Sequence, residues 1–193
     1  MFVVRNAGNM IPDTSRYGFT LEVSVTTEPA ALELAMSRGG VRHIIVCGHS
    51  DCKAMNLLHS LHQCLKTFDV NSPMDHWVRR NRFNSIKRLH ERLHEGPKIM
   101  KFESELIPSE NFEVVIDPLE ELSINVLQQL INIMSYEFLR RHFETGRLFV
   151  HGMWFDINNG DDYLFSKKQK LFVLVHVGFL DCLHICSNNF PIF

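Results

Sequence analysis

The first part of the chain alternates between strand-like and helix-like hydrophobic patterns. Residues 1–6 form a short apolar run that predicts a strand. The sequence Thr-Glu-Pro at 27–29 is typical of a helix N-terminus, and the Gly-Gly pair at 39–40 is typical of a helix end. Residues 41–47 are almost continuously apolar, as in a strand that is covered on both faces. This order of elements predicts a parallel strand–helix–strand unit.

The remainder of the chain continues this alternation and ends with an antiparallel pair. Residues 52–64 predict a helix, residues 73–95 a largely solvated helical region, and prolines 97 and 108 frame a loop. Helical spacing of apolar side chains is clearest over residues 121–143. Residues 148–157 and 163–175 predict two strands joined by the turn Asn-Asn-Gly-Asp at 158–161.

Together these elements predict a single α/β domain. We expect a mostly parallel central sheet with an antiparallel edge hairpin and flanking helices. A chain of 193 residues is long enough for one domain with a sizeable core. The domain is expected to cover residues 1–175, because residues 176–193 depart from the alternating pattern and form a divergent tail.

Composition argues against several classes of partner. A formal net charge of -2 and a pI near 6.6 produce no strong field toward nucleic acid or an anionic membrane. The apolar stretch 171–186 contains His176, Asp181 and His184, and is shorter than the roughly 20 residues that span a bilayer.

No targeting segment is visible, so we expect an intracellular protein, cytoplasmic or mitochondrial. Five irregularly spaced cysteines favour thiols or thiolate ligands over a disulfide framework.

His49 and Cys52 are the candidate metal ligands. The strand at 41–47 runs directly into Cys-Gly-His-Ser-Asp-Cys, so these side chains follow its carboxyl end, where α/β proteins place their sites. Imidazole nitrogen and thiolate sulfur are both zinc ligands, and Gly48 permits a close turn. By itself His-x-x-Cys is a weak signal, a loop histidine beside an inert thiol is the simpler interpretation, and the spacing alone does not decide between them. His43, in the strand, is expected to be a packed histidine.

Longer strings of the sequence resemble the β-class carbonic anhydrases, particularly those of animals. The strings are FVVRNAGNMIP, EPAALELAMSRGGVRHIIVCGHSDCKAM, INVLQQLINIMSYEFLRR and GRLFVHGMWFDINNGDDYLFS. They extend over about residues 1–173. The resemblance implies a zinc lyase that reversibly hydrates carbon dioxide to bicarbonate and a proton, in which zinc activates a water molecule.

The resemblance assigns roles to particular residues. It implies that His49 and Cys52 are the second and third zinc ligands. Phe2 and Ala7 match positions that line the pocket for carbon dioxide, and the backbone N–H of Lys53 matches a position that can bind the substrate anion at a helix N-terminus. Relatives are oligomeric, so a homodimer or higher oligomer is expected.

The family's first zinc cysteine and its Asp–Arg dyad lie in a Cys-x-Asp-Ser-Arg strand that precedes the stretch matching Phe2. We therefore expect an amino-terminally truncated member that lacks one internal strand and retains no catalytic dyad. Two further hypotheses stay open. One is a non-catalytic subunit or pseudoenzyme that pairs with a full-length partner, and the other is an unrelated doubly wound binding domain that needs no zinc.

Overall fold

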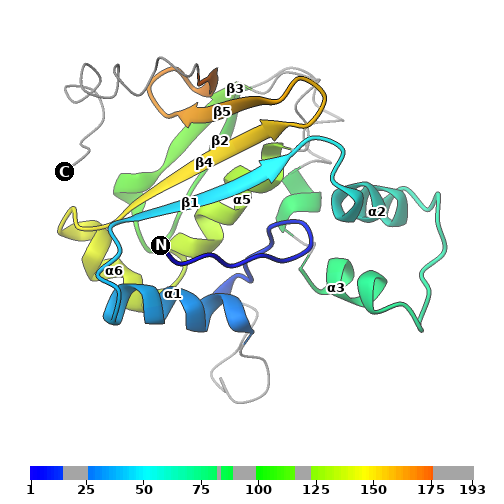
Figure 1. Ribbon diagram of the computed structural model, residues 1–193, viewed down its shortest axis with the longest axis horizontal. Coiled ribbons are helices and arrows are strands. Elements are labelled where there is room, and N and C mark those ends of the chain that lie inside the picture. Colours follow the sequence, from blue (N-terminus) through cyan, green and yellow to red (C-terminus); the bar gives the residue numbers. More distant parts are fainter. Residues whose placement is uncertain (15–25, 82–83, 89–98, 116–122, 176–193) are drawn as a thin grey trace.

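A computed structural model describes residues 1–14, 26–81, 84–88, 99–115 and 123–175 of the chain (Figure 1). Its central sheet has the strand order β1-β4-β5-β6. These strands are β1 (His43–His49), β4 (Phe149–Asp156), β5 (Asp161–Ser166) and β6 (Leu171–Leu174). β1 pairs with β4 in parallel, whereas β4–β5 and β5–β6 are antiparallel. The central sheet is therefore mixed, and β1 is an edge strand among the described residues.

Helices and a second, smaller sheet surround this sheet. The hairpin of β2 (Ile99–Phe102) and β3 (Phe112–Val115) lies on the same side as helix α5, with a 3-10 turn at Pro108–Glu110 between its strands (Figure 1). The helices are α1 (Thr27–Ser37), α2 (Lys53–His62), α3 (Pro73–Asn81), α5 (Ser123–Met134) and α6 (Glu137–Glu144). No helix in the described ranges has the length and apolar character needed to cross a bilayer.

Helix α5 packs directly against one face of the sheet, at two glycines. A Cβ on Gly48 of β1 would lie 2.4 Å from a methyl group of Val126, and a Cβ on Gly152 of β4 would lie 3.3 Å from the same side chain. Val126 is completely buried. The sequence suggested that Gly48 is needed for a turn, but its place within β1 shows that close approach of the helix is what excludes a side chain there.

Buried amide side chains of α5 hold the amino-terminal segment in place. Asn125 donates to the carbonyl of Gly8 at 2.8 Å, and Asn132 donates to the carbonyl of Ile11 at 2.7 Å. Gln129 accepts a hydrogen bond from the backbone N–H of Ile11 at 2.6 Å. Tyr136, just beyond the helix, donates to the carbonyl of Pro12 at 2.6 Å. A segment without regular secondary structure thus has its backbone groups paired by side chains.

The α/β class, the flanking helices and the antiparallel edge are confirmed, while several predicted elements differ. Residues 1–6 form no strand, and the side chains of Phe2, Val3 and Val4 are at least half exposed. Residues 163–175 form β5 and β6 instead of one strand, so antiparallel pairing takes a larger share of the sheet than expected. The turn between them contains no glycine or proline, so its sequence does not signal a turn. Lys170 adopts the positive φ of 59° that glycine would favour.

Two helical predictions also need correction. The single helix expected at 121–143 is divided into α5 and α6 in its described part, because Tyr136 between them has an extended backbone with φ -83° and ψ 118°. The region 73–95 is less solvated than predicted among its described residues. Val78 is fully buried, and the buried Asp75 carboxylate accepts hydrogen bonds from the Ser72 hydroxyl and the Lys66 ammonium. Residues 176–193, the expected tail, lie outside the described residues.

The amide pairing of α5 can be tested with a single substitution. Gln129→Ala removes a buried side chain and leaves the partly buried N–H of Ile11 without its partner, so we expect the free energy of unfolding to fall by about 2–3 kcal/mol. The control is Gln63→Ala, at an exposed position after α2, which should change it by less than about 0.5 kcal/mol. Urea denaturation measures both variants. Equal effects of the two substitutions would contradict this role of α5.

Candidate metal centre

The two predicted ligands flank one turn at the carboxyl end of β1. His49 is the last residue of β1, and Cys52 is the N-cap of α2, with only Ser50 and Asp51 between them. Figure 1 shows this turn between the end of the cyan strand and α2. The predicted strand at 41–47 is therefore shifted by two residues, and its histidine belongs to the strand itself. The structure places both candidate donors at the sheet edge that the sequence indicated.

The ring of His49 has a defined hydrogen-bond partner. Its Nδ1 lies 2.8 Å from the carbonyl oxygen of Ser50. Because a carbonyl can only accept, this contact requires a proton on Nδ1, and in the neutral ring the lone pair is then on Nε2. Histidines that bind metals commonly donate their other ring N–H to a backbone carbonyl in this way. The contact thus orients the ring and, in the neutral form, leaves Nε2 as the nitrogen that can bind a metal.

Cys52 is buried at the start of a helix. Its side chain is a free thiol, and the residue is only 7% exposed. The first backbone hydrogen bond of α2 runs from the N–H of Asn56 to the carbonyl of Cys52. The helix dipole favours negative charge at this position, as a thiolate ligand provides. The sulfur of Cys52 therefore lies at a helix N-terminus and is protected from solvent.

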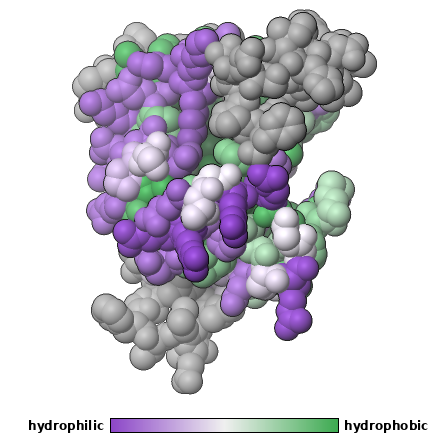
Figure 2. Space-filling model, turned by 90° about the vertical axis from the view of Figure 1, so that its left-hand side faces the viewer, coloured by the Kyte–Doolittle hydropathy of each residue, from purple (hydrophilic) through white to green (hydrophobic). Residues whose placement is uncertain are grey.

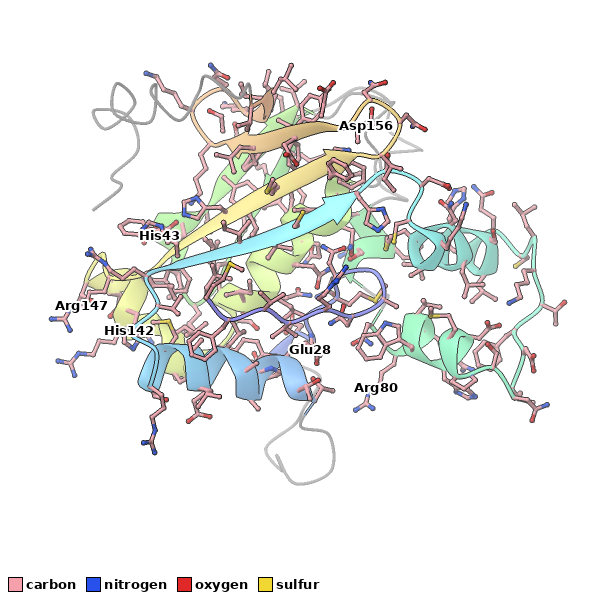
Figure 3. The ribbon with its side chains drawn as sticks, in the orientation of Figure 1. Glu28, His43, Arg80, His142, Arg147 and Asp156 are labelled. Carbon is pink, nitrogen blue, oxygen red and sulfur yellow. The ribbon has the colours of Figure 1, made fainter. Side chains whose placement is uncertain are left out.

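Hydrogen bonds with β4 and the residue after it fix the turn between His49 and Cys52. The N–H of Ser50 donates to the carbonyl of Phe155 at 2.9 Å, and the Ser50 hydroxyl donates to the Asp156 carboxylate at 3.0 Å. The N–H of Ile157 donates in turn to the Ser50 hydroxyl. Figure 3 shows Asp156 at the end of β4. The sequence interpretation missed Ser50 and Asp156, although an aspartate before Asn-Asn-Gly is a typical turn signal.

Asp51 and Lys53 interact with each other on the outside of the turn. Asp51 has a positive φ of 50°, which aspartate tolerates better than most residues. Its carboxylate accepts hydrogen bonds from Lys53 at 2.7 Å and from Asn56 at 2.9 Å, and Lys53 lowers its pKa. Both charged side chains are mostly exposed. The predicted anion-binding role of the Lys53 backbone N–H is independent of this ion pair and stays a prediction.

No third metal donor joins His49 and Cys52 within the part of the chain that the structure describes. In those residues there is no group of three or more histidine, cysteine, aspartate or glutamate side chains arranged to hold a metal ion. Burial raises the pKa of Cys47, and the nearby Asp162 carboxylate raises it further, which favours the protonated thiol. Cys64 is exposed and follows the far end of α2. Among the described residues, His49 and Cys52 are therefore two candidate donors without a third.

The predicted substrate residues lie in two different places. Ala7 precedes Gly8, at which an added Cβ would contact Ala54 of α2 at 3.5 Å, so this turn lies near the start of α2. The carbonyl of Ala7 accepts a hydrogen bond from the Trp77 indole at 2.8 Å. The ring of Phe2 instead packs against Gly39, which follows α1 and precedes β1. The structure does not bring Phe2 to His49, and its pocket role stays a prediction.

A separate cleft of about 610 Å³ lies on another part of the described surface. Its lining includes Asp13, Lys87, Glu103 and Ser135, and contains neither His49 nor Cys52. The side chains of this cleft carry both signs of charge. It is therefore distinct from the candidate metal centre.

The structure is an α/β protein whose mixed sheet has a histidine and a cysteine at its carboxyl edge, and comparisons with known proteins define the family. The carbonic anhydrase family model matches residues 1–161. Beta carbonic anhydrase 1 of Caenorhabditis elegans is 67% identical over 182 residues, which cover 91% of this chain and 67% of that protein. The chain belongs to the carbonic anhydrase family, and specifically to the β class of animal type.

Solved structures agree on the fold. The β-carbonic anhydrase CcaA matches with a TM-score of 0.62 at 24% identity, over 90% of this chain and 71% of that one. A tetrameric β-carbonic anhydrase of Sordaria macrospora matches with a TM-score of 0.51 at 22% identity, over 86% and 68%. Carbonic anhydrases are lyases, so family membership supports carbon dioxide hydration as the general activity.

The Asp156 contacts predict how acid affects this turn. Hydrogen bonds from the Asn158 N–H and the Ser50 hydroxyl lower the pKa of Asp156. Their stabilisation is therefore complete above the ordinary aspartate pKa of about 3.9, and is lost as the pH falls through the lower folded-state value. We expect Asp156→Asn to lower the free energy of unfolding at pH 7, with a difference that shrinks below pH about 3.9.

Urea denaturation of both proteins at neutral and acidic pH measures that difference. Glu33→Gln, at an exposed position of α1, is the control and should behave like the wild type at both pH values. A difference between wild type and Asp156→Asn that stays constant with pH would exclude the carboxylate contacts as its cause.

Proposed function

We propose that this protein hydrates carbon dioxide at a zinc ion held by Nε2 of His49, Sγ of Cys52 and a third donor from outside the described residues. The hydrogen bond from Nδ1 of His49 to the Ser50 carbonyl carries the proposal, because it orients the ring and leaves Nε2 free. The buried thiol at the N-cap of α2 supports it. Family membership supplies the reaction class.

When bound, zinc supplies a Lewis acid that lowers the pKa of water to about 7. The chain's own residues would hold and orient it. Ser50 keeps His49 in the required tautomer and ties the turn to β4. The bicarbonate product is an anion, and the free N–H groups at the start of α2, including that of Lys53, are suited to bind it. The turn at Ala7 would close the site near Ala54.

Assembly with further chains is part of this proposal. One structural relative is described as tetrameric. β1 is an edge strand among the described residues, and its Ile45 side chain is 58% exposed. Exposed strand edges with apolar side chains favour pairing with another chain. We therefore expect a homodimer or a higher oligomer.

Cobalt substitution tests the sulfur ligand without relying on activity. Co²⁺ bound through Cys52 should show a thiolate-to-metal charge-transfer band, and Cys52→Ser should abolish it because a hydroxyl is a far weaker ligand than a thiolate. His49→Gln should reduce metal content. Cys64→Ser, which removes an exposed thiol beyond α2, is the matched control and should keep the band. A band that persists in Cys52→Ser would refute the assignment.

The ligand count predicts a difference between two polypeptides. One limited to these 193 residues should lose zinc readily and hydrate carbon dioxide no faster than buffer, since the resemblance assigns the first ligand and the Asp–Arg dyad elsewhere. Adding the family's Cys-x-Asp-Ser-Arg strand before Met1 should restore zinc binding and hydration.

Stopped-flow hydration and zinc content measure both polypeptides. An active, zinc-replete 193-residue polypeptide would contradict the ligand count. An extended polypeptide that binds zinc but stays inactive would instead favour the non-catalytic subunit that pairs with a full-length partner.

A further inference from the structure

Two histidines meet on the face of the sheet that α5 leaves uncovered. Gly48 and Gly152 show that α5 packs against the even-numbered residues of β1 and β4. His43 and His151 belong to the opposite, odd-numbered face. Ile45 is opposite His151 in the parallel register, so His43 and His151 are diagonal neighbours on adjacent strands. Their Nδ1 and Nε2 atoms, respectively, are 3.0 Å apart.

Packing orients this histidine pair. The ring of His43 stacks on Phe149 with a centroid distance of 5.3 Å and on His151 at the same distance. His43 is an exposed residue, whereas His151 is half-buried. The sequence suggested a packed strand histidine at position 43, but the structure shows it at the surface. Figure 3 shows His43 near the start of β1. Figure 2 views this end of the molecule, where hydrophilic residues predominate.

We propose that His43 and His151 form a second metal site, which binds a divalent cation of planar or tetragonal preference such as Cu²⁺ or Ni²⁺. Two nitrogens in adjacent positions of a planar site lie about 2.9 Å apart at bond lengths of about 2.0 Å, whereas tetrahedral zinc requires about 3.3 Å. The observed separation of 3.0 Å is close to the planar value. Water molecules would complete the coordination.

The state of His151 favours metal binding near neutral pH. Burial, then the neighbouring His43 and Lys167, lower the pKa of His151 to about 4. His151 is therefore neutral at pH 7, and its lone pair need not be freed from a proton. The positive charge of the nearby Lys167 would repel a bound metal cation, but its ammonium is paired with the Glu110 carboxylate. Metal binding replaces the hydrogen bond between the rings.

This site is independent of His49 and Cys52, so it can be tested in the Cys52→Ser background, where copper cannot bind that thiolate. Electron paramagnetic resonance with Cu²⁺ as the probe should show coupling to two imidazole nitrogens at one site per chain. His43→Gln and His151→Gln should each weaken copper binding at least about tenfold, which is about 1.4 kcal/mol. His142→Gln, in α6 at the same end of the molecule, should bind copper like its parent (Figure 3).

Two results would overturn the proposal. One is copper binding of equal strength in the parent, His43→Gln and His151→Gln proteins. The other is a copper signal without coupling to two nitrogens in the parent, the Cys52→Ser protein. Because this second result needs no further substitution, the test stays valid if a histidine variant fails to fold. A melting temperature that Cu²⁺ raises in the parent and in His142→Gln, but not in His43→Gln, would support a site that bridges β1 and β4.

Discussion

The parallel pairing of β1 with β4 is the constraint on which the rest of the structure depends. Seven residue pairs, from His43 with Phe149 to His49 with Phe155, define one register. The N–H of Ser50 extends this pairing beyond the strand by donating to the carbonyl of Phe155. A one-residue slip in register would move His49 to the other face of the sheet and separate Ser50 from Asp156. The strand pair therefore positions the candidate metal centre at one end and the histidine pair near the other.

Helix α5 couples this strand pair to the amino-terminal segment. Its Val126 side chain contacts the sheet where Gly48 and Gly152 leave room, while its Asn125 and other amides bind backbone groups of the segment before Thr14. The Ala7–Gly8 turn is thereby held beside α2. One buried helix thus positions β1 relative to α2 and to Ala7, a predicted residue of the carbon dioxide pocket. Its amides are costly to leave unpaired, which makes this arrangement specific as well as stable.

The sequence alone could predict the elements whose signals are local. Near-continuous apolar residues marked β1, Thr-Glu-Pro marked the start of α1, and the resemblance to β-class carbonic anhydrases pointed to His49 and Cys52. It could not predict features that depend on contacts distant in sequence. The carboxylate of Asp156 is 106 residues from its partner Ser50, and the ring nitrogens of His43 and His151 are separated by 108 residues.

Some local errors also have physical causes. The apolar run at residues 1–6 looks like a strand, but no described strand pairs with it. The turn before β6 contains Lys170 at a positive φ, where glycine or asparagine would have signalled it. The break between α5 and α6 lies at Tyr136, which has an extended backbone and whose hydroxyl donates to the distant carbonyl of Pro12, a contact that residue type alone does not specify.

The central claim is that His49 and Cys52 bind the same zinc ion through nitrogen and sulfur. X-ray absorption at the zinc edge of the zinc-loaded protein tests it most directly. The account predicts a shell with sulfur at about 2.3 Å and imidazole nitrogen at about 2.0–2.1 Å, with less sulfur in Cys52→Ser and less imidazole in His49→Gln. A shell of oxygen and nitrogen without sulfur, or one that neither substitution changes, would contradict it.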